Sequence, residues 1–288
     1  MRPSSVAAVQ ILKFTSPGSD KNSFASSQAE DLLAVETPLE IRIVYGPEKE
    51  RQQKNISVTM CTPGHDSELA AGFLFTEGII QSRGDILKMV AVEEAGNSGG
   101  NIVIAELRPG ISFDPKKIER HFYTSSSCGV CGKSSIEAVK TVFSKPGIQD
   151  KIGISAPVLT KLPDTLRKQQ EVFEHTGGLH ASALFNVSGE LLLTREDVGR
   201  HNALDKLIGA ALTAGDIPLD HHILLLSGRA SFELIQKAAM AGIKFVCAVG
   251  APSSLAVELA KECDMTLVGF LRDGRFNIYT GDQRIINY

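Results

Sequence analysis

The chain contains no tryptophan, and aromatic residues make up only 6% of its 288 positions. Its five cysteines are odd in number and irregularly spaced, which argues against a disulfide framework and for a reducing compartment. No apolar run reaches the length of a membrane span, and a net charge of −3 gives no general affinity for nucleic acid or membrane surfaces. The apolar stretch Val6–Leu12 is too short and polar for a signal peptide, so we expect a cytoplasmic protein.

The composition supports a folded core, because 43% of the 288 residues are hydrophobic. The beginning of the chain is an exception: it is rich in Ser, Ala and Lys and has little to bury. We predict a flexible N-terminal arm at 1–30, a small α+β domain at 31–124, a mobile cysteine loop at 125–133 and a larger α/β domain at 134–288.

The two predicted domains differ in their hydrophobic rhythm. In the first, strands are expected over 39–45, 55–61, 88–92 and 101–107, with a helix from Asp66. In the second, short apolar strands alternate with amphipathic helices, which is typical of a sheet covered on both faces. Its strands are expected over 181–187, 190–194, 223–226, 245–249, 266–271 and 276–279, and its helices from Ser134 and over 203–213, 232–241 and 253–263.

The most informative feature is a single Cys-x-x-Cys motif, Cys128-Gly-Val-Cys131, within a run of Ser and Gly residues. Ser134-x-x-Glu137 follows it as a capping box, which predicts that a helix begins there. The free N–H groups of a helix start, together with the charge of Lys133, favour a thiolate nearby. A lowered thiol pKa makes a cysteine reactive toward other sulfur species.

Three interpretations of this cysteine pair stay open from the residues alone. A structural zinc site needs four ligands, and the chain has no second Cys-x-x-Cys, although His121 lies upstream. The other cysteines, Cys61, Cys247 and Cys263, lie in apolar segments. A thioredoxin-type dithiol needs a βα unit, but the preceding segment 116–123 has the pattern of a short helix. The third interpretation is a reactive thiol that carries a group such as a persulfide.

Polar and glycine residues collect directly after the predicted strands of the second domain, at 195–202, 227–231, 250–254 and 270–275. Ligands of such sheets bind beyond the carboxyl ends of the strands, near helix N-termini. Arginines beside free helix N–H groups suit a phosphate, and Phe270 could stack on a ring. Capping and turn chemistry explains each loop singly, but the four together favour an anionic, nucleotide-like ligand.

The densest polar cluster is Glu196–Asn202, which could hold acid and base groups or form a buried ion-pair network that fixes the loop. We favour the network slightly. His175 and His180 flank a Gly-Gly pair and favour a turn with satisfied histidines over a metal pair. No dinucleotide-binding, P-loop or nucleophile-elbow motif occurs.

Further motifs stand in order between about residue 32 and residue 280. They are Thr59-Met60-Cys61-Thr62-Pro63, Gly72-Phe73-Leu74-x-Thr76-Glu77-Gly78, Cys128-Gly129-x-Cys131-Gly132, Gly177-Gly178-x-His180-Ala181, Glu196-Asp197-Val198-Gly199-Arg200-His201-Asn202-Ala203-x-Asp205-Lys206, Ser227-Gly228-Arg229, Gly269-Phe270-x-Arg272 and Asn277-Ile278-Tyr279-Thr280. With these the chain resembles the FdhD family of formate dehydrogenase accessory proteins. The long string from Glu196 to Lys206 makes the resemblance specific.

The resemblance implies a sulfur carrier of the sulfurtransferase type. Such proteins take persulfide sulfur from a cysteine desulfurase and pass it to the molybdenum (or tungsten) bis-molybdopterin guanine dinucleotide cofactor before its insertion into formate dehydrogenase. A guanine nucleotide would mimic that substrate. A homodimer is expected, because two related sites would meet the two guanine ends. A cofactor-binding chaperone without sulfur chemistry is the alternative.

The resemblance also implies the site residues and a fold similar to cytidine deaminases, with layers in the order α/β/α. It assigns the persulfide to Cys128 and an assisting role to Cys131. It assigns cofactor binding to Phe270, Leu271, Arg272, Asp273, Gly274 and Arg275, and we place Arg229 beside them. No zinc and no deaminase activity are expected, because deaminases need His-x-Glu or Cys-x-Glu, whereas His180 is followed by Ala-Ser here.

Overall fold

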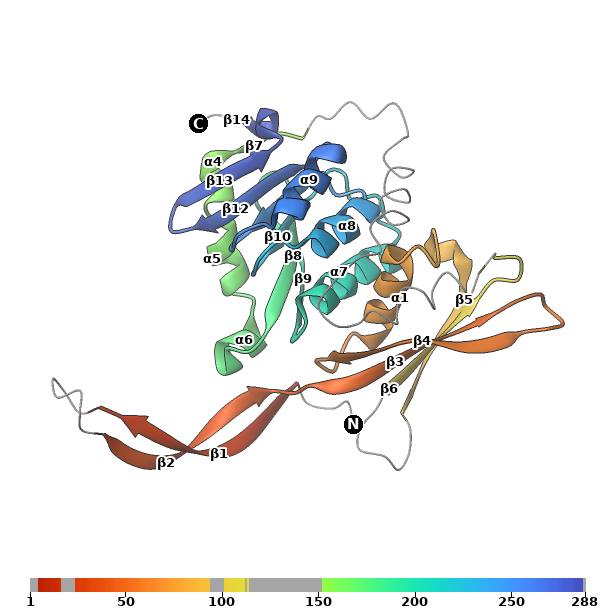
Figure 1. Ribbon diagram of the computed structural model, residues 1–288, viewed down its shortest axis with the longest axis horizontal. Coiled ribbons are helices and arrows are strands. Elements are labelled where there is room, and N and C mark those ends of the chain that lie inside the picture. Colours follow the sequence, from red (N-terminus) through yellow and green to blue (C-terminus); the bar gives the residue numbers. More distant parts are fainter. Residues whose placement is uncertain (1–4, 17–23, 94–100, 112, 114–151, 287–288) are drawn as a thin grey trace.

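The computed structural model describes residues 5–16, 24–93, 101–111, 113 and 152–286. The cysteine loop at 125–133 and the helix expected from Ser134 lie outside these ranges. Figure 1 shows a long N-terminal hairpin, a small sheet, and a large sheet with its helices. Two helices, α1 and α7, lie between the small and the large sheet.

The strands outside the large sheet are β1 (Val6–Thr15), β2 (Ala25–Ala34), β3 (Thr37–Tyr45), β4 (Gln52–Cys61), β5 (Ile86–Glu93), β6 (Asn101–Leu107), β7 (Ile154–Ser155) and β14 (Ile285–Ile286). Those of the large sheet are β8 (His180–Phe185), β9 (Leu191–Asp197), β10 (Ile223–Leu226), β11 (Phe245–Ala248), β12 (Thr266–Arg272) and β13 (Arg275–Thr280). The helices are α1 (Asp66–Thr76), α4 (Ala156–Leu159), α5 (Leu162–Arg167), α6 (Glu171–Thr176), α7 (Arg200–Ala214), α8 (Phe232–Met240) and α9 (Ser254–Glu262).

The large sheet has the strand order β13-β12-β11-β10-β8-β9. Strands β10, β11 and β12 run parallel, and β8 runs antiparallel to both of its neighbours, β9 and β10. Strands β9, β10, β11 and β12 therefore run in one direction, and β8 runs in the opposite direction. Their carboxyl ends meet at one edge of the sheet, together with the first residue of β8.

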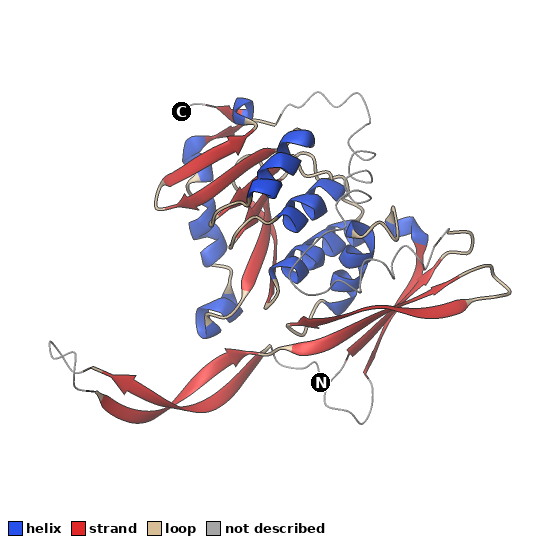
Figure 2. Cartoon of the chain, in the orientation of Figure 1, coloured by secondary structure: helices blue, strands red, loops and turns tan. Residues whose placement is uncertain are grey.

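Helices cover both faces of this sheet, as Figure 2 shows. On one face α7, α8 and α9 bury alternate strand residues such as Leu224 and Val246. On the other face α4 and α5 pack against Phe185 and Leu225 in a second buried cluster. The expected sheet with two covered faces is confirmed. Within the described ranges, no helix combines the length and hydrophobicity that crossing a bilayer would require.

The small sheet has the order β4-β3-β6-β5, and its buried face packs on α1. Helix α1 in turn crosses α7 so closely that a Cβ atom on Gly72 would lie 1.8 Å from the Asp205 carbonyl oxygen. Gly209 meets the Glu68 carbonyl oxygen in the same way. One continuous hydrophobic core therefore runs from the small sheet through α1 and α7 to the large sheet.

The expectation of a flexible arm at 1–30 is wrong for its described residues. Strands β1 and β2 pair antiparallel over their full length, from Val6 opposite Ala34 to Thr15 opposite Ala25. Most residues of β1 and β2 are exposed, as the composition of this segment predicts. The backbone hydrogen bonds of a hairpin can form without burial, and for that reason the segment is a pair of strands. The predicted boundary at residue 31 falls inside β2.

Candidate functional site

The loops that follow β10, β11 and β12 are joined by backbone hydrogen bonds at the carboxyl edge of the large sheet. The Gly250 N–H donates to the Gly228 carbonyl over 2.9 Å, and the Phe270 N–H donates to the Gly250 carbonyl over 3.0 Å. The Ser227 hydroxyl accepts from the Ala181 N–H over 2.8 Å, which ties the same loops to β8. The predicted convergence of the polar loops at one sheet edge is confirmed for these three.

Positive groups concentrate at this edge. His180, the first residue of β8, has its pKa lowered by burial and by the nearby charges of Arg200, His201 and Arg229, against a smaller opposing effect of Asp197. The Nε atom of Arg200 is buried and has no hydrogen-bond partner among the described groups. A ligand with negative charge would therefore meet several cationic side chains here.

His201 joins the starts of α7 and α8. Its Nε2 atom lies 2.9 Å from Glu233 Oε2 and 3.4 Å from the Ser231 hydroxyl. The hydrogen bond from His201 lowers the pKa of Glu233, so the carboxylate is ionised near neutral pH. This pair holds the two helix N-termini at a fixed spacing beside the cationic edge.

The predicted stretch Phe270–Arg275 forms the end of β12, the turn and the start of β13. Phe270 has a φ of 53° at a break in the strand register, and Asp273 and Gly274 adopt φ of 54° and 71° in the two-residue turn between Arg272 and Arg275. Positive φ at both turn positions is what a tight hairpin requires. Leu271 is fully buried in the core, whereas the two arginines are exposed. Cofactor binding by this stretch stays a prediction.

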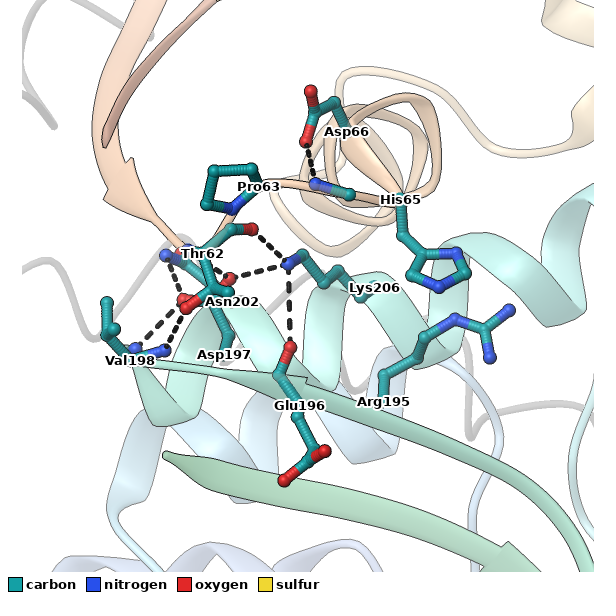
Figure 3. Close-up of polar contacts among 12 residues, drawn as sticks. Thr62, Pro63, His65, Asp66, Arg195, Glu196, Asp197, Val198, Asn202 and Lys206 are labelled. Carbon is teal, nitrogen blue, oxygen red and sulfur yellow. Dashed lines mark hydrogen bonds and ion pairs between the residues drawn. The ribbon is translucent and has the colours of Figure 1, made fainter. Parts of the chain in front are cut away.

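The Glu196–Asn202 loop is held by a buried ion pair, shown in Figure 3. Asp197 is 0% exposed, and its Oδ2 atom lies 2.7 Å from Lys206 Nζ and accepts from the Thr62 N–H. Its Oδ1 atom accepts from the Gly199 N–H and from the Asn202 side-chain amide. The ammonium of Lys206 also donates to the Thr62 carbonyl over 2.7 Å.

This network confirms the interpretation of the loop as a structural ion-pair cluster. It joins the end of β9 and helix α7 to the segment after β4, which lies more than a hundred residues earlier in the chain. Nearby, Arg195 makes a second link, donating twice to the Glu68 carboxylate of α1. Burial raises the pKa of Glu68, but hydrogen bonds from His65 and Arg195 outweigh it and hold the pKa at about 2.

Replacing Lys206 with methionine is expected to lower the free energy of unfolding by about 3–5 kcal/mol, because it leaves the Asp197 carboxylate buried without its counter-charge. Lys261→Met removes an exposed lysine as the matched control and is expected to stay within about 0.5 kcal/mol of the wild type. Urea unfolding measures both. A Lys206→Met loss no larger than that of the control would contradict the structural role of the pair.

The site-residue predictions at Cys128 and Cys131 lie outside the described residues. The alternative of a zinc site involves the same pair and His121, so it is untested as well. Of the histidine pair, His175 lies in the last turn of α6 and His180 begins β8, with Gly177 in a left-handed conformation after the helix. In the described part of the chain, no group of three His, Cys, Asp or Glu side chains is placed to hold a metal ion.

The sequence reasoning missed a pocket of about 470 Å³ beside the cationic edge. One wall comes from α5, α6 and the turn between them, and the other from His180, Ser227 and Val249 at the sheet edge. The helices of this region are short. Prolines near the starts of α4 and α5 and the helical spacing of Leu159, Leu162 and Leu166 could nevertheless have predicted helices here.

These features define a layered α/β protein with a cationic sheet edge next to a pocket. The chain belongs to the FdhD/NarQ family, whose family model matches residues 34–286. The resemblance read from the sequence motifs is thus confirmed.

Curated relatives named "Sulfur carrier protein FdhD" match nearly the whole chain. The relative from Streptomyces coelicolor is 49% identical over 266 residues, which cover 91% of each chain. That from Mycobacterium tuberculosis is 49% identical over 261 residues, covering 88% of this chain and 92% of the relative. That from Thermoplasma volcanium is 43% identical over 266 residues, covering 92% of this chain and 93% of the relative.

A solved structure from Desulfotalea psychrophila, described as a formate dehydrogenase accessory protein, superimposes with a TM-score of 0.68. The match covers 97% of this chain and 99% of the other, at 24% sequence identity. At that identity the likeness shows a shared fold.

Proposed function

We propose that this chain is a sulfur carrier required for formate dehydrogenase activity. Cys128 accepts persulfide sulfur from a cysteine desulfurase, and the sulfur then passes to the molybdenum (or tungsten) bis-molybdopterin guanine dinucleotide cofactor before that cofactor enters formate dehydrogenase. Support comes from the curated names of relatives up to 49% identical to this chain and from the Cys128-x-x-Cys131 motif that it carries.

The observation that carries the proposal is the state of the other cysteines. Cys61, Cys247 and Cys263 are all buried in the described core. Burial raises the pKa of Cys61 to about 12 and raises that of Cys247 as well. Because the thiolate is the nucleophile in sulfur exchange, these thiols are poorly suited to the reaction. Sulfur chemistry on this chain therefore falls to Cys128 and Cys131.

The proposed reaction is an exchange followed by a release. The Cys128 thiolate attacks the terminal sulfur of the desulfurase persulfide, a new S–S bond forms, and the desulfurase thiolate leaves, so no net oxidation occurs. The Cys131 thiolate then attacks the Sγ atom of Cys128 and releases sulfide to the metal of the substrate. The two cysteines are left as a disulfide, which a cellular thiol reductant returns to thiols.

The guanine dinucleotide part of the substrate is proposed to dock at the cationic edge. Arg229 follows β10 and lies against Gly250, to whose carbonyl the Phe270 N–H is bonded. Arg272 and Arg275 flank the exposed turn beyond Phe270. Guanidinium groups bind phosphate oxygens in a bidentate manner, which suits a pyrophosphate.

The remaining parts of the proposal concern fold likeness, assembly and location. The helices on both faces of the sheet support a cytidine-deaminase-like layering. A homodimer would present two such edges to the two guanine ends of one cofactor. A cytoplasmic location is part of the proposal, because the carrier chemistry needs cysteines in the reduced thiol form.

A cofactor-binding chaperone without sulfur chemistry is the second candidate function. The cationic edge and the adjoining pocket favour it equally, because neither involves a thiol. The two functions differ in one respect: a chaperone tolerates the loss of both Cys128 and Cys131, whereas a carrier does not.

The variant Arg272→Ala/Arg275→Ala is expected to weaken GDP binding by at least about tenfold, because two phosphate-directed charges are lost. Lys49→Ala/Lys261→Ala removes two exposed positive charges elsewhere and controls for net charge. Calorimetric titration of each protein with GDP makes the comparison. Equal affinities in the two double variants would remove this turn from the proposed binding site.

A further inference from the structure

The hairpin of β1 and β2 is a sheet of only two strands. Within the described ranges, neither strand pairs with any strand other than its hairpin partner. Figure 1 shows the hairpin projecting away from the two larger sheets. An isolated two-stranded hairpin is marginally stable in water, and independent stability needs three or more strands or packing against a helix. The hairpin therefore has the form of an arm that a further strand would complete.

The two strands of the arm differ in how well they suit a further strand. On β1, Leu12 and Phe14 are 57% and 61% exposed, and Lys13 is the only charged residue. Strand β2 instead carries two adjacent carboxylates, Glu30 and Asp31, and several serines. Apolar and β-branched residues favour strand pairing, whereas charged residues on an edge disfavour it. The outer edge of β1 is therefore the better template.

The root of the arm is held to the body through β2. Helix α6 packs against β2, and a Cβ atom on Gly178 would lie 3.7 Å from the Ala34 Cβ atom. The Val35 N–H donates to the Ser5 carbonyl over 2.9 Å, which closes the base of the hairpin. These contacts fix the direction of the arm and leave the outer edge of β1 for a partner.

We propose that β1 pairs antiparallel with β1 of a second copy of this chain, so that two hairpins form one four-stranded sheet. A twofold axis perpendicular to this sheet passes between the two Ile11 residues. Main-chain hydrogen bonds then complete the β1 edge of each copy, as in β-strand addition. The same surface is used by both copies, so the interface closes at a dimer. The inference rests on the homodimer of the proposed function, for which it supplies the interface, and it is independent of the sulfur chemistry.

Charge complementarity sets the register of the two copies. Within the hairpin, Asp31 lies opposite Val9 and Ser27 lies opposite Lys13. An axis at Ile11 places Val9 opposite Lys13 of the partner subunit. Asp31 then shares a row and a face with the partner's Lys13, two strand spacings or about 10 Å away, which the two side chains span. An axis one residue earlier or later would put Lys13 in a row without a carboxylate.

The same register covers the exposed aromatic ring of β1. Within the hairpin, Ala8 lies opposite Leu32. An axis at Ile11 places Phe14 of the partner subunit on the other side of Ala8. The small alanine leaves room for the ring to reach Leu32, and aromatic–aliphatic pairs across strands are stabilising. One register thus gives ion pairs on one face of the four-stranded sheet and apolar contacts on the other.

Sedimentation of the full chain over a range of concentrations tests the interface. Ile11→Arg places two guanidinium charges together on the axis and is expected to raise the dissociation constant of the dimer at least about tenfold. Val58→Arg makes a matched change at an exposed residue of the small sheet and is expected to leave that constant unchanged. Equal dissociation constants for the wild type and Ile11→Arg would overturn the inference.

Reversal of the two charges tests the register. Lys13→Glu and Asp31→Lys are each expected to weaken the dimer, because each places like charges in one row. The double variant Lys13→Glu/Asp31→Lys is expected to recover the wild-type dissociation constant. Within one hairpin these residues lie four positions apart along the strands, about 13 Å, so recovery reports a contact between copies. A double variant as weak as the two single variants combined would overturn the register.

The outcomes separate this inference from the proposed function. If the wild type and Ile11→Arg form equally tight dimers, the copies meet elsewhere, and the homodimer stands without this interface. If the wild type is a monomer at every concentration, the homodimer and the inference both fail. Persulfide formation on Cys128 is expected in the wild type and in Ile11→Arg alike, because the exchange involves one copy of the chain. Its absence from both would contradict the carrier function and leave the interface unaffected.

Discussion

Cells that carry Cys128→Ala in place of the wild-type chain are expected to lose formate dehydrogenase activity completely, while the protein accumulates in folded form. The substitution removes one sulfur atom from the Ser- and Gly-rich run in which Cys128 stands. The substitution removes the proposed first acceptor of the desulfurase sulfur, so the proposed transfer cannot begin. Formate oxidation in cell extracts, together with the amount of soluble carrier protein, measures the effect.

Cys263→Ala is the matched control for the loss of a thiol. That side chain is 2% exposed and packs in the hydrophobic core, so its removal costs about 1 kcal/mol of stability and leaves the sulfur chemistry intact. Formate dehydrogenase activity is therefore expected to persist. Wild-type activity in Cys128→Ala would reject the carrier function and favour the cofactor chaperone.

Gly72→Ala is expected to destabilise the chain by about 3 kcal/mol or more, a large part of the stability of a typical domain. The new Cβ atom would lie 1.8 Å from the Asp205 carbonyl oxygen and 2.9 Å from the Gly209 nitrogen. Both are backbone atoms of α7, so no side-chain rotation relieves the contact, and the two helices must separate. Separation would open the core that joins the small sheet to the large one.

Thermal and urea unfolding measure that loss, with Gly178→Ala as the control. At Gly178 the nearest atom to an added Cβ is 3.7 Å away, which is an ordinary contact. This variant is expected to unfold within about 0.5 kcal/mol of the wild type. Comparable stability in Gly72→Ala and Gly178→Ala would contradict the close crossing of α1 and α7.

Much of the described fold could be predicted, because many elements carry a strong local signal. Strand β6 was placed at its observed bounds, and β10 likewise, since each is a compact apolar run between turn residues. Helices α7, α8 and α9 were recognised from their apolar faces. The hairpin of β1 and β2 was missed because its strands are mostly exposed. Strands that bury neither face do not need alternating apolar and polar residues, which is the pattern that predicts a strand.

The site was predictable only where its residues are close in sequence. The motif from Glu196 to Lys206 indicated an ion-pair network, but its partner Thr62 comes from a distant segment and could not be named. The pocket was missed because α5 and α6 have only six residues each, so the proline and leucine pattern of this segment could indicate helices but not the side chains that line a pocket. Leu271 belongs to the predicted binding stretch and is completely buried, which the sequence did not indicate, and cofactor binding by that stretch stays a prediction.

The most direct test of the sulfur-carrier function is the intact mass of the protein after incubation with a cysteine desulfurase and cysteine. We expect a gain of one sulfur atom, about 32 Da, which a reducing agent removes. The gain should be absent in Cys128→Ala and present in Cys263→Ala. If the desulfurase turns over and the wild-type mass does not change, the chain carries no sulfur, and the central claim is contradicted.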